Sequence, residues 1–366
     1  MKAKLEDVCE RGSSNLRQSD VEEMSGDYPI YGASGYIGNV DFYHQELPYV
    51  AVVKDGAGIG RTMLLPARSS VIGTMQYLLP KGNVLPEYLY YVVRHMHLEK
   101  YFSGATIPHI YFRDYKTETF NLESITRQAE IVAVLSQVEA IISARQQQLQ
   151  KLEELVKARF VELFVNNEAV SKWPHHTIAD VSKEMRTGPF GSALHHDEFV
   201  DSGVFVLGID NAVENKFSYN RMRYITEEKY QQLKRYTVYP GDVIITIMGT
   251  VGRSAVIPSD IPKAINTKHL ACITPDTEII NALFLSSAFQ IHPDIRMQLQ
   301  KQCKGAIMDG LNLTVIKGLS FPIPPINNQN QFVEFYEQID QSKAVIQRAL
   351  EEAQTLFDSL MQKYYG

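Results

Sequence analysis

The chain has 366 residues, of which 45% are hydrophobic and 21% are charged, a composition that excludes a disordered chain. At roughly 100 to 200 residues per domain, this length predicts two or three domains. The sequence begins with MKAKLEDVCE, without an apolar signal segment, and has no run of about 18 apolar residues, so we expect neither export nor a membrane span. Three cysteines without CxxC spacing argue against disulfides and structural zinc and favour a cytoplasmic location.

The net charge of −6, taken over the whole chain, disfavours a nucleic-acid partner. Its distribution weakens that objection, because residues 1–127 contain 13 basic and 15 acidic side chains and residues 165–327 contain 16 of each. The excess is concentrated in residues 128–164, with 4 basic against 5 acidic, and in residues 328–366, with 3 against 6. The two large segments are nearly neutral, and each can still carry a basic face.

Residues 1–123 predict an α+β domain with short strands and long loops. Residues 49–53 are an apolar run typical of a strand, and residues 86–97 are typical of a short helix. Residues 56–61, GAGIGR, lack the G-x-G-x-x-G spacing of a dinucleotide-binding loop. We interpret them as a hairpin whose glycines let the backbone approach a large ligand and whose Arg61 offers a donor fork to guanine or phosphate. A plain hairpin with a local salt bridge is the alternative.

Residues 124–168 predict one long helix. Neither Gly nor Pro occurs from residue 128 to residue 164, and apolar residues recur at steps of four and three, the pattern of a coiled-coil seam. Arg145 and Arg159 interrupt this seam. Its apolar positions are Ile131, Leu135, Val138, Ile142, Leu149, Leu152, Val156 and Leu163.

Residues 169–326 repeat the plan of the first segment. Residues 242–247 predict a strand and residues 279–289 a short helix, and GTVGR at residues 249–253 forms a second Gly-Arg hairpin. We place Thr267-Lys268-His269 at the position of Thr74-Met75-Gln76, and residues 305–310 at that of residues 104–109.

Residues 327–366 predict a second long helix. A shift of 201 residues brings Phe120 onto Phe321 and Gln128 onto Gln329, so the chain is a tandem duplication of a domain followed by a helix. The second seam consists of Phe332, Tyr336, Ile339, Lys343, Ile346, Leu350, Ala353, Phe357, Leu360 and Tyr364.

We expect the two helices, each roughly 54 Å long, to form an antiparallel coiled coil. This arrangement separates the two domains and relates them by a pseudo-two-fold axis. The alternative is that each seam packs only on its own domain.

No residue pattern predicts catalysis or metal binding. The sequence has no G-x-x-x-x-G-K-[ST] loop, no H-E-x-x-H and no nucleophile-elbow serine. The histidine clusters His175-His176 and His195-His196-Asp197 are better explained as solvated loops than as metal sites, because adjacent side chains point apart. If the protein acts in an enzyme, a partner carries the catalysis.

The order of these parts resembles the specificity subunit of type I restriction-modification enzymes, over essentially the whole chain. In the second half, residues 187–192 (TGPFGS), Gly241-Asp242 with the hairpin at 249–253, and residues 321–325 (FPIPP) carry the resemblance. In the first half, residues 28–38 (YPIYGASGYIG) look like another variant of the same domain. The first hairpin departs from the pattern, because Ala57-Gly58 stands where the second half has Gly249-Thr250.

The resemblance implies a non-catalytic DNA-recognition subunit with two target-recognition domains, each reading one half of a bipartite target in double-stranded DNA. The helices would set the spacer and dock two methyltransferase subunits, and motor/nuclease subunits would join in the restriction complex. No cofactor would bind this chain directly, since S-adenosylmethionine, and ATP with Mg in the restriction form, belong to those partners. The alternative is a non-DNA protein-binding adaptor with a coiled-coil spacer.

We expect the DNA contacts to come from turn-rich segments at related places in the two domains, with no catalytic or metal-binding residues. The candidates are Tyr31, Ser34, Lys54, Arg61, Thr74, Gln76, Thr106, His109, Arg186, Phe190, Ser192, Thr250, Arg253, Thr267, Lys268, His269 and Lys304.

Overall fold

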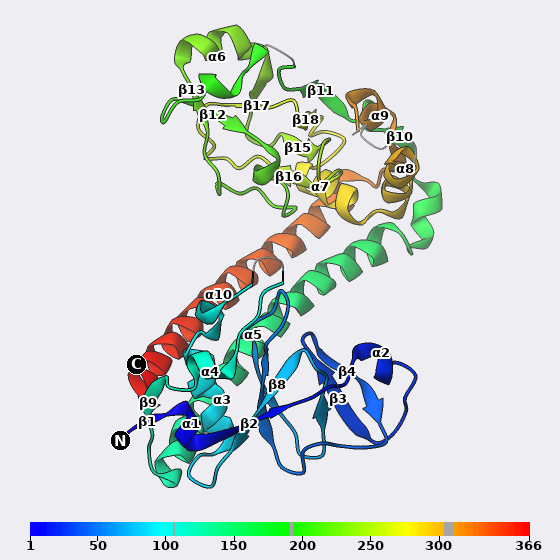
Figure 1. Cartoon of the computed structure of the whole chain (residues 1–366). Coiled ribbons are helices and arrows are strands. Elements are labelled where there is room, and N and C mark those ends of the chain that lie inside the picture. Colours follow the sequence, from blue (N-terminus) through cyan, green and yellow to red (C-terminus); the bar gives the residue numbers. More distant parts are fainter. Residues whose placement is uncertain (105–106, 191–192, 304–310) are drawn as a thin grey trace. The chain divides into compact units, whose positions relative to one another are not determined.

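A computed structural model of the chain describes residues 1–104, 107–190, 193–303 and 311–366 (Figure 1). The chain forms two compact units, one of Met1–Gln148 with Ile346–Gly366 and the other of Leu149–Val345. Each unit holds one domain of mixed helices and strands together with part of each long helix. The prediction of two tandem α+β domains is confirmed. In the described ranges, no helix is both long enough and apolar enough to cross a membrane.

The first domain is built on a four-stranded antiparallel sheet with the order β2-β8-β5-β6. These strands are Cys9–Ser13 (β2), Met75–Pro80 (β8), Tyr49–Val53 (β5) and Thr62–Leu65 (β6). A second sheet, β4-β3-β7, consists of Gly35–Val40 (β4), Tyr28–Gly32 (β3) and Ser70–Val71 (β7), and β3 and β7 run parallel. The other elements are β1 (Lys2–Lys4) paired with β9 (Thr119–Asn121), α1 (Leu5–Val8), α2 (Gln18–Val21), α3 (Pro86–His95) and α4 (Phe112–Tyr115).

The second domain repeats this topology. Its antiparallel sheet β11-β18-β15-β16 consists of Ser182–Thr187 (β11), Leu270–Pro275 (β18), Val243–Thr246 (β15) and Ser254–Val256 (β16). Its second sheet, β13-β12-β17-β14, consists of Tyr224–Ile225 (β13), Val204–Leu207 (β12), Ala264–Asn266 (β17) and Thr237–Val238 (β14), and β12 and β17 run parallel. The other elements are β10 (His175–Thr177) paired with β19 (Ser320–Pro322), α6 (Glu227–Leu233), α7 (Ala282–Ile291), α8 (Pro293–Cys303) and α9 (Leu313–Gly318). The predicted duplication is thus confirmed, with β14 as an additional strand of the second domain.

The prediction of loops at the histidine clusters is wrong in one case. His175 and His176 lie in β10, where they pair with Pro322 and Phe321 of β19. His195 and His196 are exposed at a short 3-10 turn, as expected of a solvated segment.

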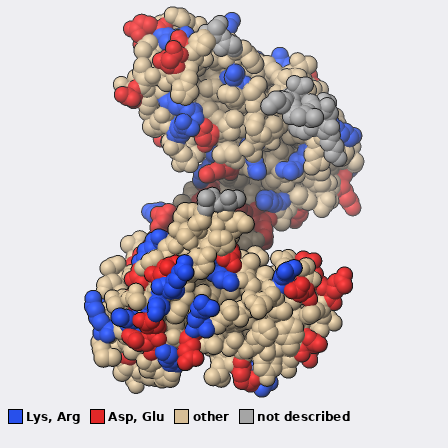
Figure 2. Space-filling view, viewed as in Figure 1, with Lys and Arg blue, Asp and Glu red and all other residues tan. Residues whose placement is uncertain are grey.

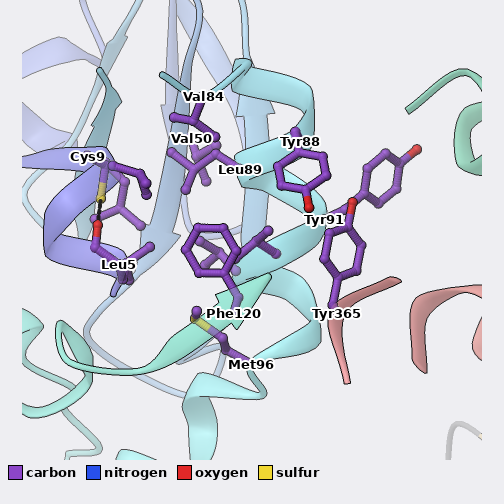
Figure 3. Close-up of a cluster of buried hydrophobic side chains, with 14 of the residues drawn as sticks. Leu5, Cys9, Val50, Val84, Tyr88, Leu89, Tyr91, Met96, Phe120 and Tyr365 are labelled. Carbon is purple, nitrogen blue, oxygen red and sulfur yellow. Dashed lines mark hydrogen bonds between the residues drawn. The ribbon is translucent and has the colours of Figure 1, made fainter. Parts of the chain in front are cut away.

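Strand β5 reads as an uninterrupted apolar run because both of its faces are covered. Val50 and Val52 pack with Tyr88 and Leu89 of α3, in the core cluster shown in Figure 3. Tyr49, Ala51 and Val53 face the other way, in a cluster with Val71 and Tyr77. A half-exposed strand would instead alternate apolar and polar residues.

The two long helices, α5 (Ile125–Phe164) and α10 (Ile326–Tyr365), have 40 residues each. In the first unit, Ile131 and Leu135 near the start of α5 share a core with Met361 and Tyr365 near the end of α10.

In the second unit, Phe160 near the end of α5 packs on Phe332 near the start of α10, with ring centroids 5.3 Å apart. Lys343, the polar interruption of the second seam, lies 3.0 Å from Glu153 of α5 through its Nζ atom. The predicted antiparallel pairing is therefore confirmed within each unit. The helix of the predicted segment 124–168 ends at Phe164, and Asn167 caps the next turn through its side-chain oxygen.

A buried glutamine joins each long helix to the short helix of its domain. Gln128 accepts a hydrogen bond from the backbone N–H of Leu85, the residue before α3, at 2.8 Å. Its amide nitrogen donates to the carbonyls of Asn83 at 3.0 Å and Glu123 at 2.9 Å. All of these groups are backbone atoms at the start of a helix or in the turn before it.

Gln329 makes the same three contacts in the second domain. It accepts from the N–H of Asn281, the residue before α7, at 2.9 Å, and it donates to the carbonyls of Ile279 at 2.9 Å and Pro324 at 2.8 Å. Both glutamine residues are fully buried. Two equivalent polar side chains thus satisfy equivalent buried backbone groups, and we call each contact set a glutamine clamp.

We expect Gln128→Leu or Gln329→Leu to lower the free energy of unfolding by about 2 to 4 kcal/mol, because each change leaves buried backbone groups without partners. Denaturant unfolding of the whole chain measures the change. Gln150→Leu, on an exposed position of α5, is the matched control and should have an effect of about 0.5 kcal/mol or less. A clamp variant as stable as the control would contradict this role.

His292 makes the stability of the second domain depend on pH. The residue is 3% exposed and its ring packs against Phe160 and Phe321. Burial lowers the pKa of His292 below its ordinary value of 6.5, and the nearby Asp294 carboxylate partly opposes that shift. At a pH between the pKa of His292 in the folded protein and 6.5, the unfolded chain therefore binds more protons at this histidine than the folded protein does.

The free energy of unfolding should consequently fall as pH drops below about 6.5 and level off at higher pH. We expect His292→Phe to flatten that part of the profile, while other histidines keep their contributions in both proteins. Denaturant midpoints of the two proteins from pH 5 to 8 test this, and parallel profiles would rule it out.

Candidate nucleic-acid interface

The Gly-Arg hairpin of the first domain ends the main sheet where β5 stops and β6 begins. The Val53 N–H donates to the Arg61 carbonyl at 2.9 Å, and the Gly60 N–H donates to the Val53 carbonyl at 2.9 Å. Beside the hairpin, the Lys54 N–H donates to the Thr74 carbonyl at 3.0 Å. The same sheet end therefore carries three of the predicted DNA contacts, Lys54, Arg61 and Thr74.

The second hairpin has the same frame. The Thr246 N–H donates to the Arg253 carbonyl at 2.8 Å, and the Gly252 N–H donates to the Thr246 carbonyl at 2.9 Å. Gly60 and Gly252 both have a φ of 82°, a left-handed conformation that favours glycine. The second hairpin spans one residue fewer between these paired strand ends, which explains why Ala57-Gly58 has no direct counterpart in Gly249-Thr250.

The predicted match of Thr74-Met75-Gln76 with Thr267-Lys268-His269 is wrong by two residues. The Ile247 N–H donates to the His269 carbonyl at 2.9 Å, so His269 is the equivalent of Thr74. Likewise, the N–H of Ile72 donates to Tyr31 and that of Thr267 to Leu207, both at 3.0 Å. The second domain has three more residues between its hairpin and β18, from Arg253 to His269 against Arg61 to Thr74, and this insertion breaks a constant offset.

The first domain brings its predicted residues together in two groups. Arg61 is exposed, and its Nη1 donates to the Ala33 carbonyl at 2.9 Å, next to the exposed Ser34. Tyr31 precedes this turn and is half-buried. In the second group, Lys54 and His109 flank Asp55: the Lys54 Nζ lies 3.8 Å from a carboxylate oxygen, and the His109 Nδ1 lies 2.6 Å from the other.

Next to this second group lie an aromatic pair and a cation–π contact that were not predicted from the sequence. The ring of His109 stacks on Tyr111 with centroids 6.3 Å apart and an interplanar angle of 24°. The Arg113 guanidinium lies 4.8 Å from the Tyr111 ring centroid. Tyr111 and Arg113 are both exposed. The signal in the sequence was the closeness of His109, Tyr111 and Arg113 within five residues, the last of them already in α4.

Two of the predicted DNA contacts, Gln76 and Arg186, have side chains that are buried within the domains. Gln76 is 4% exposed, and its amide nitrogen donates to the Tyr115 hydroxyl at 3.1 Å. Arg186 is 8% exposed and forms an ion pair with Asp242 at 2.5 Å. Its Nε donates to the Thr237 carbonyl at 2.9 Å.

The hydroxyls of two other predicted residues also point inward. The Oγ1 atoms of Thr74 and Thr267 are buried and have no hydrogen-bond partner within the described ranges. These threonines lie at the predicted sheet ends, but they do not present their hydroxyls to a ligand in this structure.

The second domain leaves several of its predicted residues accessible. Thr250, Arg253 and Lys268 are exposed, and Phe190 is 55% exposed. His269 is half-buried, and burial, followed by the charges of Lys268 and Arg223, lowers its pKa. The neighbouring ion pair of Arg223 with Asp210, at 2.5 Å, was not predicted. Of the remaining predicted residues, Thr106, Ser192 and Lys304 lie outside the described residues.

Charge is mixed on the visible face of each unit in Figure 2. On the face shown in Figure 2, Lys and Arg side chains are interspersed with Asp and Glu side chains. Among the residues that the structure describes, no cluster of three or more His, Cys, Asp or Glu side chains could hold a metal ion. The accessible groups at the sheet ends are hydrogen-bond donors, aromatic rings and cations, which suit contact with bases and phosphates.

Comparison with known proteins gives this architecture a family. The family model described as type I restriction modification DNA specificity domain matches residues 1–154 and 190–354. The chain therefore belongs to the type I restriction-modification DNA specificity domain family.

Similar proteins are named as specificity subunits or S subunits of type I systems. The chain is 25% identical over 197 residues to the specificity subunit of the type I restriction enzyme EcoBI of Escherichia coli, covering 53% of this chain and 41% of that protein. It is 20% identical over 345 residues to the MjaVIII specificity subunit of Methanocaldococcus jannaschii, covering 87% and 80%. The crystal structure of the S subunit of a type I system from M. genitalium matches with a TM-score of 0.65 at 16% identity, covering 100% of this chain and 96% of that one. The alignment thus spans less than half of the E. coli relative, and the solved structure supports the fold.

We expect Arg186→Ala to lower the free energy of unfolding by about 3 to 5 kcal/mol, because Asp242 would remain buried without its charge partner. Asp242→Ala combined with Arg186→Ala should be less destabilising than the sum of the two single changes. Denaturant unfolding of the three variants tests the assignment. If Arg186→Ala folds with native stability and loses DNA binding instead, the side chain belongs to the interface after all.

Proposed function

We propose that the chain is the non-catalytic DNA-recognition subunit of a type I restriction-modification complex, in which each domain reads one half of a bipartite target. The observation that carries this proposal is the duplicated sheet end. Each copy holds a Gly-Arg hairpin in the same hydrogen-bonded frame, and each surrounds it with different side chains. Membership of the specificity-domain family supports the proposal, as do relatives named as specificity subunits.

The differences between the copies account for an asymmetric target. The first domain offers Lys54, His109 and the exposed Tyr111 at its sheet end, whereas the second offers Lys268 and His269. Base edges in the major groove present distinct patterns of donors and acceptors, so two different side-chain sets select two different half-sites. A non-DNA adaptor would not need this repeated cationic frame.

We further propose that two methyltransferase subunits dock on the helices and that motor/nuclease subunits join them in the restriction form. Apolar side chains on α5 support a docking role: in the first unit, Val134 and Ile141 are 40% and 44% exposed. They lie seven residues apart and so share one face of the helix. In the second unit, Leu155 is 46% exposed. In this proposal the methyltransferase partners bind S-adenosylmethionine and flip out the adenine, and ATP with Mg belongs to the motor/nuclease subunits.

Mapping methylated adenines in host DNA, with and without the gene for this chain, tests the proposal. We expect a bipartite motif to lose its methylation when the gene is deleted and to regain it on complementation. Retention of the chain on DNA after mixing with a methyltransferase subunit distinguishes the proposal from a protein-binding adaptor. Unchanged methylation together with no retention would refute DNA recognition.

The proposed role of the helices can be tested by changing their length, which should change the preferred spacer between the two half-sites. Seven residues inserted after Gln148 in α5 and seven after Val345 in α10 lengthen both helices at the boundary between the units and preserve the seam pattern. The added length is about 10.5 Å, or roughly three base pairs of DNA. We expect a preference for a longer spacer, or loss of specific binding because three base pairs also rotate a half-site by roughly 100°.

The measurement is binding of the assembled methyltransferase complex to duplexes with graded spacers. Seven residues inserted after Ser259, in an exposed turn of the second domain, serve as the control and should leave the spacer preference unchanged. An intact complex of the lengthened protein with its original spacer preference would show that the helices do not set the distance.

A further inference from the structure

The turn that follows β3 is an arginine-binding position in the first domain. Arg61 extends from the hairpin, and its Nη1 donates to the Ala33 carbonyl in this turn at 2.9 Å. The guanidinium also lies over the hairpin itself, because a Cβ atom at Gly58 would stand 3.7 Å from the Arg61 Cζ. Arg61 is thus fixed between the hairpin and the turn, yet it remains exposed.

The equivalent turn of the second domain follows β12. Its position is set by the matched hydrogen bonds from Ile72 to Tyr31 and from Thr267 to Leu207, which make Ile209 the counterpart of Ala33. The larger Ile209 side chain packs towards the hairpin, where a Cβ at Gly249 would stand 3.3 Å from its Cδ1. An isoleucine therefore meets the hairpin at the counterpart of the turn that binds Arg61 in the first domain.

Arg253, the sequence counterpart of Arg61, does not bind this turn. It is exposed, and its guanidinium makes no hydrogen bond or ion pair within the described ranges. A long side chain without a fixed position loses more conformational entropy when it binds a base than one that is already held.

A different arginine, Arg223, lies against the turn of the second domain. It directly precedes β13, and its carbonyl accepts the Val206 N–H at 2.8 Å, which fixes its backbone on β12. Its Nη2 lies 2.5 Å from the Asp210 carboxylate within the turn. Its Nη1 lies so close to Gly208 that a Cβ atom there would overlap it. The absence of a side chain at Gly208 is therefore what leaves room for the guanidinium.

We propose that Arg223, positioned by Asp210 and Gly208, is the base-contacting arginine of the second domain in place of Arg253, and that it reads a guanine. This inference rests on the proposed function. Asp210 takes one of the donors of the guanidinium and leaves others for the O6 and N7 acceptors of guanine, to which arginine binds through two donors.

The Asp210 carboxylate also favours contact of Arg223 with a base over contact with the DNA backbone. Asp210 neutralises Arg223 locally and repels phosphate oxygens, so the pair is poorly suited to a phosphate contact. The side chain of Arg223 is 21% exposed and that of Asp210 33%, so the pair is accessible at one edge while its geometry is held from the other side. One Asp210 oxygen is buried without a partner within the described ranges, so removing Arg223 outright would strand a carboxylate. The test therefore relies on variants that keep the charge.

The experiment measures binding of the chain assembled with methyltransferase subunits to its mapped target and to duplexes changed at each position. Gly208→Ala keeps every charge, and the φ of −124° at this position suits alanine, but its Cβ displaces the Arg223 guanidinium. Arg223→Lys keeps the charge and removes the donor fork. We expect each variant to lose about 5- to 150-fold discrimination at one G·C pair of the second half-site and none in the first.

Arg253→Ala and Arg221→Ala are the matched controls, since both residues are exposed and Arg221 belongs to the same segment as Arg223. We expect these controls to lower affinity equally for all duplexes, without a change in base preference. Thermal unfolding of each variant confirms that the second domain stays folded.

Two results would overturn the inference while the proposed function stands. One is relaxed preference at a single base pair in Arg253→Ala with native preference in Gly208→Ala and Arg223→Lys. The other is an equal loss for all duplexes in the last two variants, which would assign Arg223 to phosphate. If the wild-type assembly itself shows no sequence preference, the proposed function fails, and this inference fails with it.

Discussion

The glutamine clamps are the contacts on which the rest of each unit depends. A buried amide has to satisfy its own donors and acceptor, and Gln128 and Gln329 do so only if the long helix, the turn before it and the start of the short helix adopt one relative placement. The short helix in turn covers one face of the main sheet, as Tyr88 and Leu89 do over Val50 and Val52. The sheet end that carries the hairpin is therefore held in a fixed orientation to the long helix, as the proposed recognition of a spaced target would require.

Around this shared frame, the two domains differ in their added elements and in the lengths of their loops. Strand order and pairing are the same in both main sheets, but the second domain adds β14 and the longer helix α8, shortens the hairpin by one residue and lengthens the segment before β18 by three. The frame depends on buried apolar contacts and backbone hydrogen bonds, which tolerate few changes. Loops at the sheet end carry neither constraint, so they can vary in length and side chain while the domain stays folded.

The sequence was sufficient to predict the features that depend on local pattern. Seam positions such as Ile131 and Phe357 follow from helical periodicity, and the Gln128 and Gln329 match follows from one constant offset. The sequence did not predict which polar residues are buried, because their partners are distant in the chain. Arg186 contacts Asp242 and Thr274, which lie 56 and 88 residues away. Gln76 contacts Tyr115, which lies 39 residues away. The mistaken match of Thr74 with Thr267 has a similar origin. An insertion in a loop changes the offset between equivalent residues of the two domains, and neither motif reveals where the insertion lies.

The two arginine positions show how the sheet ends of two duplicated domains can diverge while the fold is kept. In the first domain the small Ala33 leaves its carbonyl open to the hairpin arginine, whereas in the second domain Ile209 packs on the hairpin and a carboxylate appears one residue later, at Asp210. That carboxylate gives a different arginine, from the neighbouring strand segment, a fixed place over Gly208. The equivalent contact is then conserved in space and not in sequence, because what the frame provides is a turn of fixed position at the sheet end. Any arginine that reaches this turn and finds a partner there can present its donor fork. Under the proposed function, base preference could therefore change through two or three substitutions that leave the clamp, the sheet and the helix seam untouched.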